Sequence, residues 1–325
     1  MAKIDLLNLS ELLETPISQF NLTISASHKE VIKVLYALLK EKGILWRPHI
    51  WLADEWFSPD GVDGFAIPFT LAHPRLSRLE KRTVGFIEGE SKREFLKLAA
   101  HEMGHAIDNA FGLRKKKRRQ QIFGLSSKKY PSSYRPKPNK KSDFVEHLGD
   151  YYAQAHPEED WAETFAVWLT QKNWPKKYKG TKALIKLQYV DEVMTSLKGI
   201  KPHKSNRHTP LIYKEDDRTL KEFLLCKRKQ LNPRSPVDKN IIQFFGTKEG
   251  INLAEYLREN KVILTSKIAA AKDSWYTEKY LKEIKMVCRT KGLKKINRLQ
   301  VKEFGRFLEK DLNRYIQKGQ ARIYM

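Results

Sequence analysis

Two histidines four residues apart, with a glutamate directly after the first, are the clearest chemical signal in the chain. They are His101, Glu102 and His105 in the segment HEMGH. On a helix, residues four apart lie on one face, so both imidazoles can bind a single zinc ion. Glu102 then lies beside the metal, where a carboxylate can activate a water molecule. This spacing predicts a zinc site if the segment is helical. The alternative is an ordinary helix face that happens to carry His and Glu.

The flanking residues favour a helix. Ser91 with Glu94 three residues later is a capping-box pattern, and the apolar residues of FLKLAA follow it. Gly112 stands where such a helix would end, since glycine adopts the left-handed conformation of a helix C-terminus at little cost. The sequence therefore predicts a helix that starts after Ser91 and carries the HEMGH segment.

A catalytic zinc usually takes a third protein ligand, and a downstream acidic helix is the best source of it. The position ten residues after His101 is Phe111, which excludes the metzincin arrangement. Pro157 suits the first position of a helix, and the acids that follow suit its positive end. Glu159 and Glu163, four apart, share a face of that helix. One would bind the metal while the other orients a ligand histidine.

Three neighbouring residues keep other assignments open. Glu158 and His156 are rival third ligands, because a shift of one residue in helix phase would exchange them with Glu159. Asp108, three residues after His105, falls on the face of the two histidines and is a second candidate for orienting a ligand.

The remaining elements are read from apolar spacing and turn residues. Residues 1–45 are expected to be mainly helical, and residues 46–90 to form strands and turns. Residues 64–69 form an apolar stretch in which Pro68 cannot donate to a sheet, so a strand there belongs at an edge that could align an extended peptide. The polar segment 201–210 is a plausible boundary before a basic, helical region.

The longer pattern resembles known metallopeptidases. HExxH followed by a helix with ExxxE resembles the gluzincins, and EDWAETF with Tyr152 seven residues before Glu159 is similar to their lethal-factor-like branch. Together with ADEWFSPDG, AIPF, LAHPRL and HEMGHAID, the stretch from about residue 50 to residue 200 resembles a family of bacterial zinc-binding metallopeptidases.

The resemblance implies an α+β fold with a zincin-like metallopeptidase domain, which we place at 46–200. The resemblance covers residues 1–45 and 201–325 poorly, and these are expected to be mainly helical from their own apolar spacing. It implies hydrolysis of peptide bonds in a protein or peptide substrate. The implied roles are Zn²⁺ ligation, general base catalysis, orientation of a ligand histidine and donation to the oxyanion of the reaction. The residues matching these roles are His101, His105 and Glu159 for zinc, Glu102 as base, Glu163 as orienting residue, and Tyr152 as donor with Tyr151 as its competitor.

Charge supports a different class of function. The 325 residues carry a net charge of +24, and residues 201–325 hold 30 Lys+Arg against 14 Asp+Glu. The run Arg114–Arg119 is wholly basic. A positive excess of this size favours contact with polyanions, nucleic acid first. The alternative is thus a nucleic-acid-associated basic protein in which zinc is structural or vestigial.

Several classes are excluded or disfavoured. Cys226 and Cys288 are the only cysteines, so a disulfide framework and a cysteine-rich metal module are excluded. No stretch approaches the roughly 18 apolar residues of a membrane span, and the N-terminus lacks the pattern of a secretory signal. We therefore expect a cytoplasmic protein.

Overall fold

The chain divides into two units, each with a separate hydrophobic core. Unit 1 comprises residues 1–131 and 139–231, and unit 2 comprises residues 132–138 and 232–325. The computed structural model describes residues 4–202, 205–231, 239–245, 250–267, 274–318 and 323–324. None of the helices in these ranges is long and apolar enough to cross a membrane.

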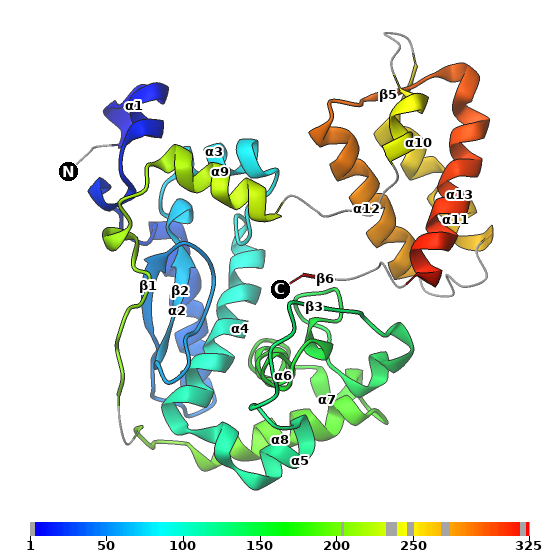
Figure 1. The fold of residues 1–325 in the computed structure, drawn as a ribbon. Helices are drawn as coiled ribbons and strands as arrows, with labels where there is room; N and C mark the ends of the chain where they lie inside the picture. The colour runs from blue at the N-terminus through cyan, green and yellow to red at the C-terminus, as the bar shows by residue number, and fades with distance from the viewer. Residues whose placement is uncertain are drawn as a thin grey trace. The chain divides into compact units, whose positions relative to one another are not determined.

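Unit 1 is a helix-rich α+β unit with one small parallel sheet (Figure 1). Its helices and strands are α1 (Leu9–Glu14), α2 (Ala26–Glu41), β1 (His49–Ala53), β2 (Gly64–Pro68), α3 (Pro74–Val84), α4 (Lys92–Phe111), α5 (Lys117–Phe123), α6 (Pro157–Thr170), α7 (Trp174–Lys177), α8 (Lys182–Ser196) and α9 (Leu220–Leu231). β1 and β2 pair in parallel from His49 opposite Gly64 to Ala53 opposite Pro68.

The helix α4 begins and ends as its sequence predicts. The Ser91 hydroxyl accepts a hydrogen bond from the Glu94 backbone N–H, which caps the first turn. Gly112 closes the helix in the left-handed conformation, at φ 59°. The later helix α6 has Pro157 in its first turn, as expected, and its N-cap is His156. The two helices that carry HEMGH and EDWAE therefore lie where local signals placed them.

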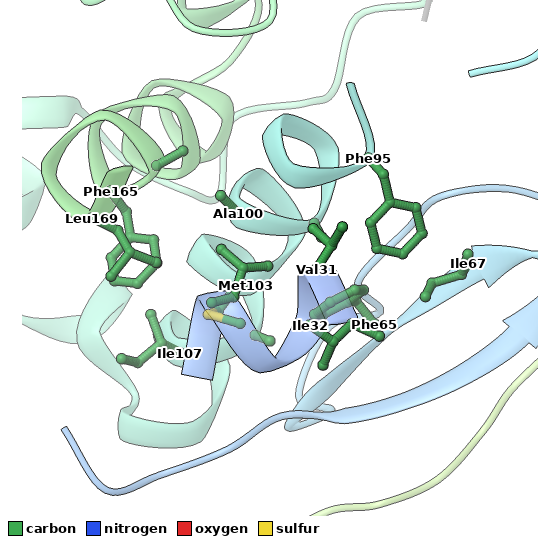
Figure 2. Close-up of a cluster of buried hydrophobic side chains, with 14 of the residues drawn as sticks. Val31, Ile32, Phe65, Ile67, Phe95, Ala100, Met103, Ile107, Phe165 and Leu169 are labelled. Carbon is green, nitrogen blue, oxygen red and sulfur yellow. The ribbon is translucent and has the colours of Figure 1, made fainter. Parts of the chain in front are cut away.

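One face of α4 packs in the core of unit 1 (Figure 2). Its side chains meet residues of α2, β2 and α6, of which Figure 2 labels Val31, Ile32, Phe65, Ile67, Phe95, Ala100, Met103, Ile107, Phe165 and Leu169. The aromatic residues Trp161, Phe165 and Trp168 of α6 are buried in the same core. This packing fixes α4 between the sheet and α6.

The strand expected at 64–69 is present as β2, but it is less accessible than predicted. All five of its residues are buried. On the side away from β1, the Ala66 N–H donates to the Phe57 carbonyl at 2.8 Å. β2 is an edge strand of its two-stranded sheet, as Pro68 indicated. The segment around Phe57, however, bridges to Ala66 and covers the side that an extended substrate would have to reach.

In its described residues, unit 2 has a helical core and three short antiparallel strand contacts. Its elements are β3 (Ser133–Tyr134), β4 (Ile251–Asn252), α10 (Leu253–Glu259), α11 (Lys261–Lys267), α12 (Ser274–Thr290), β5 (Lys295–Ile296), α13 (Val301–Gln317) and β6 (Ile323–Tyr324). Tyr280 of α12 donates to Asp311 of α13 at 2.9 Å, and Tyr315 of α13 donates to Glu283 of α12 at 2.7 Å. These buried bonds join the two long helices.

The described residues of the segment 201–210, which was expected to be a domain boundary, pack on unit 1. The Asn206 carbonyl accepts from the Asp63 N–H at 2.9 Å, and the Pro210 carbonyl accepts from the Trp51 indole at 3.1 Å. Unit 1 continues to residue 231. The division at 45/46 and 200/201 remains a prediction about domains, drawn from apolar spacing, turn residues and the polar segment 201–210.

Candidate metal centre

Two helices bring three ligand atoms together. The imidazoles of His101 and His105 project from α4, and the Glu159 carboxylate projects from the first turns of α6. All three side chains are buried, and their ligand atoms lie within 4.8 Å of one another. Among the described residues, these three form the one cluster of His, Cys, Asp or Glu able to hold a metal ion.

The separations fit a tetrahedral zinc ion. With zinc–ligand bonds of about 2.0–2.1 Å, two ligand atoms at tetrahedral positions lie about 3.3 Å apart. His101 Nε2 is 3.0 Å from Glu159 Oε2, and His105 Nε2 is 3.4 Å from the same oxygen. The two Nε2 atoms are 3.2 Å apart. Two imidazoles and one carboxylate are also a ligand set that zinc accepts, so the donors fit the metal in type and in spacing.

Glu163 holds the other side of the His101 ring. Its Oε1 lies 3.0 Å from His101 Nδ1. Its Oε2 accepts backbone N–H groups of His147 and Leu148, at 3.2 and 3.1 Å. A carboxylate held in this way accepts the Nδ1 proton and leaves Nε2 free to bind a metal.

The electrostatics of the cluster favour a bound cation. Burial alone would lower the pKa of His101, but Glu159 and Glu163 outweigh it and raise the pKa to about 10. Burial would raise the pKa of Glu159, but His105 and His101 hold it well below its usual value. The carboxylates thus stabilise positive charge at the centre of the cluster.

Glu102 has a different environment. Burial raises the pKa of its carboxyl group, with the neighbouring histidines acting against that shift. A raised pKa is what a general base working near neutral pH requires. Glu102 lines the same pocket as the three candidate ligands.

That pocket has a volume of about 310 Å³ and reaches the surface. Its walls are Trp56, Phe57, Ser58 and Asp60 from the segment after β1, the α4 residues and Arg114, the loop residues Tyr130 and Tyr152, and Glu158 and Glu159 of α6. The Tyr152 ring lies 5.5 Å from the His101 ring, between centroids. Asp150 and Tyr151, just before it, both have left-handed backbone, at φ 52° and 57°. Such strain in residues other than glycine is concentrated at functional sites.

The rival ligands have other partners. Glu158 pairs with Arg114 at 2.9 Å, and the His156 side chain accepts from the Glu158 N–H as the cap of α6. Asp108 is fully buried, and its carboxylate accepts from Arg119 at 2.9 Å. The structure therefore places Asp108 against an arginine, away from the predicted role of orienting a ligand histidine.

Tyr130 is a site residue that sequence reasoning missed. Its hydroxyl donates to Glu159 Oε1 at 2.6 Å, and its ring stacks on His156 with 3.9 Å between centroids. Burial and the charge of Glu159 raise the pKa of Tyr130, which keeps its hydroxyl protonated as a donor. It lies 29 residues before Glu159 in a basic loop, where no periodic pattern marks it.

One family model matches the part of the chain that carries the candidate metal centre. Residues 77–200 match the model of a family described as "Putative zinc-binding metallo-peptidase". The match spans both α4 and α6, and so includes all three candidate ligands together with Glu102 and Glu163. No curated protein and no solved structure matches the chain.

Proposed function

We propose that the chain is a zinc-dependent metallopeptidase of the gluzincin type, with a zincin-like domain that cleaves peptide bonds in protein or peptide substrates. The observation that carries the proposal is the buried His101–His105–Glu159 cluster, with Glu102 beside it in an open pocket. The family match of residues 77–200 supports the same chemistry.

In this proposal zinc, when bound, polarises the scissile carbonyl group and lowers the pKa of the attacking water. Glu102 accepts the proton of that water and passes it to the leaving amine. Glu163 keeps the proton of His101 on Nδ1 throughout. The Tyr152 hydroxyl would donate to the oxyanion that develops on the substrate, which is the role that the resemblance to the lethal-factor-like branch implies for this residue.

The pocket walls indicate how a substrate would lie. Trp56, Phe57 and Ser58 line the pocket together with residues of α4 and α6. Phe57 joins β2 through a single bridge to Ala66, so this segment is the outer border of the sheet. An extended peptide would lie along it, between the aromatic side chains and the metal.

The experiment is hydrolysis by Glu102→Gln compared with the wild type, with zinc content measured on the same samples. The variant should keep about one zinc per chain and lose 10²–10⁴-fold in kcat, which is the range for removing a general base. His101→Ala should lose both zinc and hydrolysis. Undiminished hydrolysis by Glu102→Gln would contradict the assigned mechanism.

A further inference from the structure

Five basic side chains follow one another at four-residue intervals along α13 and its C-cap. They are Lys302, Arg306, Lys310, Arg314 and Lys318, and all five are exposed. Residues four apart on a helix are surface neighbours, so the five side chains form one continuous row. We call this row the basic stripe.

Within the described residues, ion pairs leave most of the stripe's charge unmatched, although the exposed Glu303 lies on the same helix. Arg314 pairs with the buried Asp311 of its own helix. None of the other four is ion-paired within the ranges that the structure describes. Like charges four residues apart repel each other on a helix. A polyanion lying along α13 would remove this repulsion, and its phosphates would meet cations spaced one helical turn apart.

The rest of α13 argues against a lipid surface as the partner. A helix that lies on a membrane inserts an exposed apolar face beside its charges. The apolar face of α13 is already used, since Phe304, Leu308 and Leu312 are completely buried in the core of unit 2. The exposed positions beside the stripe are polar, at Glu303 and Gln317.

A hollow beside the stripe suits a nucleobase. It has a volume of about 450 Å³, and Lys310 and Arg314 of the stripe belong to its walls. Phe307, Asn313 and Gln317 also line it. Amide side chains read the hydrogen-bonding edge of an unpaired base, and aromatic side chains stack on its face. In a duplex the base edges are already paired with each other, so a duplex could not place a base in the hollow.

We propose that unit 2 binds single-stranded nucleic acid, with phosphates along the basic stripe and a base in the hollow beside Phe307. The observations that carry this are the row of exposed cations, of which only Arg314 is ion-paired within the described residues, and the hollow that shares Lys310 and Arg314 with it and is lined by amides, Phe307 and Asp311. The proposal is independent of the metal centre, since every residue in it belongs to unit 2.

The test is binding of the full-length protein to a fluorescently labelled 20-nucleotide single strand of mixed sequence, followed by anisotropy at several salt concentrations. The variant Arg306→Gln/Lys310→Gln/Lys318→Gln should weaken binding at least tenfold. Loss of three phosphate contacts should also make the slope of log Kd against log salt shallower by about two. The matched control Lys29→Gln/Lys40→Gln/Lys179→Gln removes the same charge from exposed positions of unit 1 and should leave Kd and slope unchanged.

A second variant separates the hollow from the stripe. Asn313→Ala/Gln317→Ala should weaken binding without changing the salt slope, because amides release no counterions. The proposal would be overturned if the unit 1 control variant lost as much affinity as the stripe variant, or if the stripe variant bound as tightly as the wild type. Tighter binding to a duplex of the same length, stripe-dependent binding to vesicles containing phosphatidylserine, or no binding by the wild type at low salt would also overturn it.

Discussion

Three buried glutamates surround the candidate metal position, and their contacts separate their tasks. Glu159 faces Nε2 of both histidines, whereas Glu163 faces Nδ1 of His101 and two backbone N–H groups. Glu102 lies in the pocket wall with a pKa raised by burial. The spacing of HEMGH and EDWAE predicted the group, because residues four apart share a helix face. The spacing left open which acid binds the metal. The rotational position of each acid on its helix and its contacts with residues far away in the sequence decide that assignment.

Tyr130 shows what residue-level prediction could not find. It reaches Glu159 from a loop, and loop positions have no periodicity from which a contact can be predicted. By holding Oε1, its hydroxyl directs Oε2 of Glu159 towards the two histidines. Such partners of metal ligands typically contribute 10–100-fold to metal affinity.

We therefore expect Tyr130→Phe to weaken zinc binding by about 10-fold or more, because the ligand carboxylate loses the bond that orients it. The measurement is competition with a chromophoric zinc chelator. Tyr152→Phe is the matched control, since it removes a phenol from the same pocket. It should keep the zinc affinity and lower kcat. Equal zinc affinities for wild type and Tyr130→Phe would show that the hydroxyl does not orient the ligand.

At the level of elements, the metal centre depends on how closely α4 approaches α6. A Cβ atom at Gly104 would lie 2.9 Å from the Ala162 Cα, which is backbone and cannot move alone. The Trp161 indole donates to the Gly104 carbonyl at 2.8 Å across the same contact. The glycine in HEMGH thus allows the helices to approach until Glu159 reaches the histidines.

Gly104→Ala should push the two helices apart and destabilise the protein by about 1–3 kcal/mol, the usual cost of overpacking. Zinc affinity should fall with it. Chemical denaturation and chelator competition measure the two effects. Gly305→Ala is the control, because its new Cβ meets only the hydroxyl at the tip of Tyr256. That variant should retain full zinc affinity, and a Gly104→Ala protein that did the same would contradict the close-approach argument.

The ends of helices could be predicted from the sequence, whereas the pairing of a strand with a distant segment could not. Ser91, Gly112 and Pro157 are local signals, and each marks a helix end as expected. The accessibility of β2 could not be predicted in this way, although its place at the sheet edge was predicted correctly. Pro68 correctly indicates that its own N–H is absent from the ladder, but only the fold reveals that Phe57 covers the other side of the strand. Pairing between distant segments has no local signal.

The whole molecule consists of two units whose cores are separate. The chain leaves unit 1 after Pro131, contributes residues 132–138 to unit 2, and returns to unit 1 at Asn139. Within unit 2, β3 of this segment pairs with β6 near the C-terminus. Composition could not predict this exchange, because the pairing joins residues almost 200 positions apart, from Tyr134 to Ile323.

Two separate cores should give two thermal transitions in calorimetry, and zinc should raise only the one that belongs to unit 1. A ligand stabilises the folded state that binds it by an amount that grows with its concentration over Kd. Repeating the scan with EDTA should lower that transition alone. In His101→Ala neither zinc nor EDTA should move it. A single transition, or a zinc-dependent shift of both, would contradict the independence of the two units.

The central claim is that His101, His105 and Glu159 bind zinc. It is tested most directly by anomalous diffraction at the zinc absorption edge from crystals of the zinc-loaded protein. The account predicts one strong peak about 2.0–2.1 Å from both Nε2 atoms and from a carboxylate oxygen of Glu159. A folded protein without a peak there, or a peak held by other side chains, would contradict it.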